Sequence, residues 1–81
     1  MIRLTLYTRP GCHLCDEMKA VVARVAASLP LVLMETDISG NAELEPRYGL
    51  EIPVLMLDGR KIAKVRVSEA DLRRALAGRT G

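Results

Sequence analysis

The first part of the chain shows two different spacings of apolar residues. Over residues 2–8 apolar and polar positions alternate, which is the period of a strand. From Cys12 to Leu29 the apolar residues recur every three or four positions, and this spacing predicts a long amphipathic helix. Pro30 lacks a backbone donor and cannot continue that helix. A strand followed by a helix is therefore expected before Pro30.

The next residues predict a second strand and a short helix. The continuous apolar run Leu31–Met34 is typical of a strand covered on both faces, so we expect Met34 in the core. A helix between two strands normally makes a right-handed crossover, and residues 2–36 therefore predict a β-α-β unit with parallel strands. Polar residues in the segment 39–49 offer caps for a short helix, which Pro46 distorts by removing a backbone donor.

The last part of the chain predicts a hairpin and a helix. Strands over residues 53–57 and 60–67 flank Asp58-Gly59, a pair that favours a type I′ turn. On the second strand, Ala63, Val65 and Val67 are expected to share one face. Ser68 begins a capping box, and apolar residues at helical spacing follow it until Gly78 ends the helix. The elements thus follow the order β-α-β-α-β-β-α, which is an α/β fold with a mixed sheet.

Composition and charge narrow the class of protein. The 81 residues are 49% apolar and 27% charged, which is typical of a globular chain, and at this length we expect one domain over residues 1–81. The net charge is only +2, and there are two Tyr but no Phe or Trp, so no nucleic-acid partner is expected. No apolar run approaches the roughly 20 residues that span a bilayer. Residues 1–8 lack a signal-peptide core, which favours the cytoplasm.

The two cysteines, Cys12 and Cys15, lie where the first strand passes into the first helix. Residues three apart on a helix are neighbours, so the pair can form a disulfide without moving the backbone. At the helix N-terminus, unpaired N–H groups and the helix dipole lower the pKa of the Cys12 thiol, which makes it the expected nucleophile. Cys15 lies on the apolar stripe, so we expect a buried resolving thiol there.

Other functions for the cysteine pair remain open. The spacing can be a coincidence, and a structural disulfide closing so small a loop stabilises little. With His13, the two thiolates can bind Cu(I) or half of a shared zinc or iron–sulfur site, although a closed zinc site needs four ligands. A third reading is an interaction module whose cysteines have lost their redox role. His13 itself is either a charged group that stabilises the Cys12 thiolate or an exposed spacer.

Two segments of the chain resemble a known family. Residues 7–15 resemble the active-site segment of glutaredoxins and small glutaredoxin-like proteins, and residues 41–54 resemble the helix and Ile-Pro segment of the thioredoxin superfamily. Together with the order of elements, the resemblance covers nearly the whole chain. It implies a thioredoxin/glutaredoxin-like fold, in which a four-stranded mixed sheet of order 2-1-3-4 is flanked by helices on both faces.

The resemblance also implies roles for particular residues. Cys12 and Cys15 match the redox pair, and Pro53 matches a cis-proline that forms, with Ile52, the substrate wall opposite the cysteines. Without the resemblance, Pro53 is also tolerated as the trans first residue of an edge strand. Arg9 matches a basic residue that meets a glutathione carboxylate, although a solvated loop charge is the simpler reading.

Two departures from the glutaredoxin pattern bear on the cosubstrate. His13-Leu14 stands where glutaredoxins usually have Pro-Tyr, and Ala63–Arg66 replaces the paired glycines and acid that bind glutathione. The expected function is thiol–disulfide exchange by a monomer on a protein or low-molecular-weight disulfide, without a bound cofactor or metal. Glutathione is one candidate cosubstrate, and thioredoxin or a reductase is the alternative electron donor.

Overall fold

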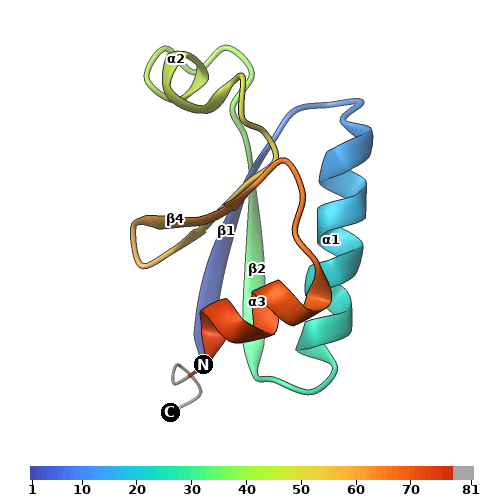
Figure 1. The fold of residues 1–81 in the computed structure, drawn as a ribbon. Helices are drawn as coiled ribbons and strands as arrows, with labels where there is room; N and C mark the ends of the chain where they lie inside the picture. Colours follow the sequence, from blue (N-terminus) through green and yellow to red (C-terminus); the bar gives the residue numbers. More distant parts are fainter. Residues whose placement is uncertain (78–81) are drawn as a thin grey trace.

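The computed structural model describes residues 1–77 and has the element order expected from the sequence (Figure 1). The expected end of the last helix at Gly78 lies outside the described residues. No helix within the described part of the chain is long and apolar enough to cross a membrane. The elements are β1 Ile2–Thr8, α1 His13–Ala26, β2 Leu31–Asp37, α2 Leu44–Tyr48, β3 Val54–Leu57, β4 Arg60–Lys64 and α3 Glu69–Leu76.

The four strands form one mixed sheet in the order β2-β1-β3-β4, which confirms the expected topology. Strands β1 and β2 are parallel, whereas β1 pairs with β3, and β3 with β4, in antiparallel fashion. The β3–β4 turn has positive φ at both central residues, 52° at Asp58 and 75° at Gly59, as a type I′ turn requires. The hairpin prediction is therefore confirmed.

The hydrophobic core lies between one face of the sheet and the helices α1 and α3 (Figure 1). The alternation along β1 points every second side chain toward these helices, and Leu4 and Leu6 are both fully buried. The apolar stripe of α1 belongs to the same buried cluster. The cluster consists of Ile2, Leu4, Leu6, Met18, Val21, Val22, Val25, Leu55, Leu57, Leu72 and Leu76.

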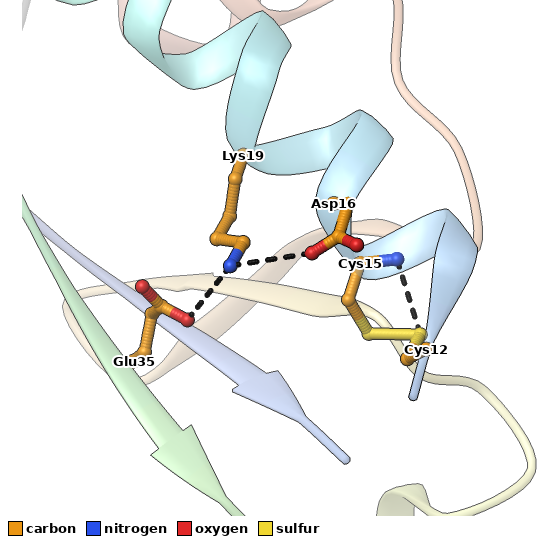
Figure 2. The surroundings of a disulfide bond; sticks show 5 residues. All are labelled: Cys12, Cys15, Asp16, Lys19 and Glu35. Carbon is orange, nitrogen blue, oxygen red and sulfur yellow. Dashed lines mark hydrogen bonds and ion pairs between the residues drawn. A yellow bond between two sulfur atoms is a disulfide. The ribbon is translucent and has the colours of Figure 1, made fainter. Parts of the chain in front are cut away.

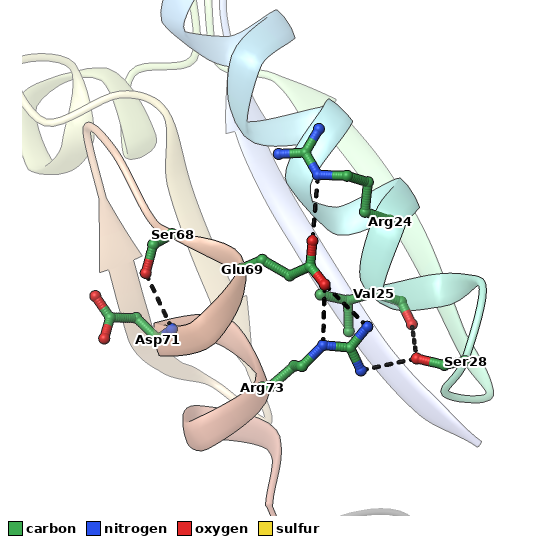
Figure 3. Close-up of polar contacts among 7 residues, drawn as sticks. All are labelled: Arg24, Val25, Ser28, Ser68, Glu69, Asp71 and Arg73. Atoms are coloured by element: carbon green, nitrogen blue, oxygen red, sulfur yellow. Dashed lines mark hydrogen bonds and ion pairs between the residues drawn. The ribbon is translucent and has the colours of Figure 1, made fainter.

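Polar contacts hold α3 against the C-terminal end of α1 (Figure 3). Glu69 of α3 accepts hydrogen bonds from Arg24 of α1 at 3.3 Å and from Arg73 one turn along its own helix at 3.2 Å. Arg73 also donates to the Ser28 hydroxyl at 2.7 Å. The Ser68 hydroxyl caps α3 by accepting from the Asp71 N–H at 3.1 Å, as the capping box predicts.

The second face of the sheet has little cover, and here one expectation is wrong. β2 lies at the sheet edge and is open on this face, where Val32 is 41% and Met34 66% exposed. Met34 is therefore a surface residue rather than a core residue. Tyr48, the last residue of α2, stacks its ring on Tyr7 of β1 with centroids 4.9 Å apart.

The expected strand over residues 60–67 is also shorter than its pattern indicates. β4 ends at Lys64, because Val65 has a positive φ of 64° and turns the chain away from the sheet. Ala63 and Val67 pack against the core, whereas Val65 is 38% exposed, so the three do not share one face. A positive φ is rare for a β-branched residue. The turn directs the chain toward α3.

Candidate active site

The two cysteines lie at the carboxyl end of β1, where α1 begins (Figure 2). They form a disulfide with Cα atoms 5.2 Å apart. Cys12 is the N-cap of α1, with an extended backbone, and its Sγ accepts a hydrogen bond from the Cys15 N–H at 3.1 Å. Its sulfur therefore lies at the helix end where free N–H groups and the helix dipole stabilise negative charge.

The two sulfurs differ in their access to solvent. Cys12 is half-buried, whereas Cys15 is only 2% exposed because it lies on the apolar stripe of α1. An incoming disulfide can therefore reach Cys12 but not Cys15. This asymmetry is what a pair with one attacking and one resolving thiol needs.

One cavity, of about 280 Å³, is lined by both cysteines and by charged side chains from three segments. Lys19 of α1 extends over it, with its Nζ 3.3 Å from Asp16 and 3.3 Å from Glu35 of β2 (Figure 2). These two carboxylates, Glu35 first, raise the pKa of Lys19. Two further charged residues line the cavity, and the full charged set is Arg9, Asp16, Lys19, Glu35 and Asp37.

A second cavity, of about 390 Å³, lies between α1 and the segment that leads from β4 to α3. Leu14, one of the two residues between the cysteines, lines one wall, and Val65 lines the other. Arg66 and Glu17 approach each other across it at 3.9 Å. Met18 and Val21 of α1 supply apolar lining to this cavity.

Ile52 and Pro53 lie at the same end of the sheet as the cysteines. They directly precede Val54, which pairs with Tyr7 near the end of β1. The Ile52–Pro53 peptide bond is cis, as the resemblance implies. Pro53 is buried, Ile52 is half-buried, and the Pro53 carbonyl accepts a hydrogen bond from the Val65 N–H at 2.8 Å.

Arg9 is held by a carboxylate of the chain itself. Its guanidinium donates to Glu45 of α2, and both side chains are about 40% exposed. The same corner contains Gly49, where a Cβ would lie 2.8 Å from the Arg9 guanidinium and 2.5 Å from the Glu45 carbonyl oxygen. Arg9 is therefore part of an ion pair that fastens α2 to the end of β1, not a free loop charge.

His13 lies at the surface, beside a carboxylate of its own helix. Its side chain is 86% exposed, and its Nε2 lies 3.1 Å from Glu17 one turn along α1. This position favours the reading as an exposed spacer. Among residues 1–77, no group of three or more His, Cys, Asp or Glu side chains is arranged to hold a metal ion.

Lys19 and Glu35, which line the cavity beside the disulfide, were not among the site residues expected from the sequence. One signal was present, because Lys19 is four residues after Cys15 and therefore shares its helix face. Glu35 gave no such signal. Its place follows from the parallel register that sets it beside Leu6, and that register is a tertiary property.

Comparisons with known proteins agree with this fold and site. The model of the glutaredoxin-like domain family (DUF836) matches residues 3–77. An uncharacterized protein of Mycobacterium tuberculosis is 31% identical, with 96% of this chain and 86% of that protein covered. The solved structure of XcR50 from X. campestris is 36% identical with a TM-score of 0.79, and 90% of this chain and 93% of that one are covered.

A thioredoxin variant from Halobacterium salinarum extends the likeness to the wider fold. It has a TM-score of 0.65 at 24% identity, with 99% of this chain and 75% of that one covered. At this identity the match supports the fold alone, and the fold is the thioredoxin-like one that the sequence resemblance implied. Because the family model matches residues 3–77 and the fold is shared, this chain belongs to the glutaredoxin-like domain family.

Proposed function

We propose that this protein is a thiol–disulfide oxidoreductase that uses Cys12 and Cys15 as a dithiol centre. The observation that carries the proposal is the disulfide between a half-buried Cys12 at the N-cap of α1 and a buried Cys15. A helix N-terminus lowers the pKa of a thiol placed on it, and the thiolate is the form that attacks disulfides. Cys12 is thus the nucleophile, and Cys15 is the resolving thiol.

The exchange proceeds in two steps that conserve atoms and electrons. The Cys12 thiolate attacks one sulfur of the substrate disulfide, which forms a mixed disulfide and releases the other substrate sulfur as a thiolate. The Cys15 thiolate then attacks Cys12 Sγ, which forms the Cys12–Cys15 disulfide and releases the second substrate thiolate. Two electrons pass from the cysteine pair to the substrate, and an external thiol reductant restores the reduced protein.

The substrate of this reaction is a disulfide-bearing protein or a low-molecular-weight disulfide. Ile52 and Pro53, at the same end of the sheet as the cysteines, form the proposed substrate wall. The electron donor is glutathione or a thioredoxin-type system in a reducing cytoplasm. If glutathione serves, its carboxylate must displace Glu45 from Arg9, because that guanidinium already holds a carboxylate.

Single-cysteine variants test the function. Cys12→Ser is expected to abolish reduction of a model disulfide, whereas Cys15→Ser is expected to accumulate a mixed disulfide with the substrate, detected as an added mass that a reductant removes. The metal content of the purified protein is measured in parallel. Full activity of Cys12→Ser, or a stoichiometric thiolate-bound metal without reversible disulfide formation, contradicts the proposal.

A further inference from the structure

The burial of the resolving cysteine disfavours the ionised form in which it has to react. Cys15 is 2% exposed, and burial among apolar groups disfavours a thiolate. In the second exchange step, however, Cys15 has to react as a thiolate. A group near Cys15 that favours the charged form would therefore speed this step.

The cavity that both cysteines line contains such a group. Cys15 lines the cavity together with Lys19, which lies one turn further along the same face of α1. The Lys19 ammonium is held from two elements, at 3.3 Å by Asp16 of α1 and at 3.3 Å by Glu35 of β2 (Figure 2). A cation is therefore fixed beside a cavity that Cys15 also lines.

The other charges on this cavity act in opposite directions. Asp16, Glu35 and Asp37 disfavour a second negative charge, whereas Arg9 at the end of β1 favours it, although Glu45 already pairs with Arg9. Lys19 thus offsets nearby carboxylates that would otherwise disfavour the Cys15 thiolate. Because two carboxylates hold Lys19, loss of one of them still leaves it anchored by the other.

We propose, on the premise of the exchange function above, that Lys19 is a positioning residue for the resolving step and favours the thiolate of Cys15, while Glu35 opposes it. In that step the Cys15 thiol releases its proton to water in the cavity, and its thiolate attacks Cys12 Sγ. One sulfur–sulfur bond forms between the cysteines, and the bond from Cys12 to the substrate breaks. The substrate leaves as a thiolate, so no further oxidant or reductant takes part.

The test follows the resolving step alone. Reduced protein reacts with dithiobis(nitrobenzoate) at low pH, which leaves a nitrothiobenzoate group on Cys12. A rapid jump to higher pH then starts the attack by Cys15, and the released coloured thiolate reports its rate. The pH at which the rate reaches half its plateau reports the pKa of the Cys15 thiol. This midpoint is a better readout than the plateau rate, because a thiolate becomes less reactive as its pKa falls.

Two variants that break the same ion pair are expected to move the midpoint in opposite directions. Lys19→Met raises it by about 0.5 pH unit or more, because the carboxylates then lose the cation that offsets them, and Glu35→Gln lowers it by a similar amount. Lys19→Arg keeps the charge and leaves the midpoint near that of the parent. The matched control Arg24→Met removes an ion pair between α1 and α3 that lies at 3.3 Å, away from the cavity, and leaves the midpoint unchanged.

The outcomes separate this inference from the function on which it rests. Shifts of Lys19→Met and Glu35→Gln in the same direction, or no shift in either, overturn the inference, because a merely structural ion pair would affect both variants alike. Failure of the parent protein to release the second thiolate at any pH contradicts the exchange function itself. Near-ultraviolet circular dichroism of each variant confirms that its fold is unchanged.

Discussion

Replacing Gly49 with alanine tests the close packing that fastens α2 to the end of β1. Gly49 has helical backbone angles, φ −55° and ψ −32°, where alanine is ordinarily the better residue. A Cβ at this position, however, would lie 2.5 Å from the carbonyl oxygen of Glu45 and 2.8 Å from the guanidinium of Arg9. The guanidinium can move, but the carbonyl belongs to α2 and accepts a hydrogen bond from the Gly49 N–H at 2.8 Å. The backbone contact therefore decides the sign.

The magnitude follows from two opposing effects. The helical preference of alanine over glycine contributes about 0.8–1.0 kcal/mol in favour of the variant. Forcing an extra methyl group into a filled space typically costs about 1–3 kcal/mol. We expect the free energy of unfolding to fall by about 1 kcal/mol, which lowers the urea midpoint by up to about 1 M for a domain of this size.

Urea unfolding followed by far-ultraviolet circular dichroism measures the effect, with Arg9→Met as a second background. If the Glu45 carbonyl is the obstacle, Gly49→Ala destabilises the protein equally with and without the Arg9 guanidinium. If the loss disappears in Arg9→Met, the guanidinium is the obstacle instead. A Gly49→Ala protein as stable as the parent or more so in the native background refutes the reasoning, because the space beside Gly49 would then be open.

Three further predictions concern stability. The Ser39 N–H, 2.8 Å from Asp37, is the main reason that the pKa of Asp37 lies below its ordinary 3.8. The stabilising contribution of Asp37 is therefore complete above about pH 4 and is lost as the pH falls through the lowered pKa. In Asp37→Asn the free energy of unfolding should depend less on pH in this acid range, and an unchanged pH dependence would contradict the prediction. Ser68→Ala removes the cap of α3 and should cost about 1 kcal/mol in urea unfolding, with a neutral result counting against the cap. Met34→Thr should change stability by less than about 0.5 kcal/mol and Met18→Ala should lower it by about 2–5 kcal/mol, and equal losses would mean that Met34 is covered after all.

The sequence predicted the fold well where the signal is local. The alternation along β1 and the helical spacing of α1 depend on neighbouring residues, and the Asp58-Gly59 pair is specific for one turn type. These features fix the order of elements. The mixed sheet follows from that order, because a crossover helix requires parallel neighbours and a tight turn requires antiparallel ones.

The two errors in the fold arise from features that local spacing does not report. A run of apolar residues is typical of a strand covered on both faces, but β2 lies at the sheet edge and α2 is too short to cover Met34. The pattern of β4 continues through Val65, yet the backbone turns there. A positive φ at a β-branched residue contradicts its intrinsic preference, so propensity predicts against it.

The same distinction applies to the candidate site. The spacing of Cys12 and Cys15 and the change from strand to helix were enough to predict that one cysteine is more accessible to solvent than the other. The ion pair of Arg9 with Glu45 and the position of Glu35 behind the disulfide were not predicted, because each depends on tertiary packing between segments that are far apart in the sequence.

The equilibrium between the Cys12–Cys15 disulfide and a graded series of glutathione buffers tests the central claim most directly. The fraction of reduced protein is measured after acid quenching and alkylation of free thiols, with metal content determined on the same sample. A dithiol exchange centre predicts a reversible two-electron transition between roughly −280 and −180 mV. A pair that stays oxidised or stays reduced across the whole series, or that holds a stoichiometric metal ion instead of cycling, would contradict the claim.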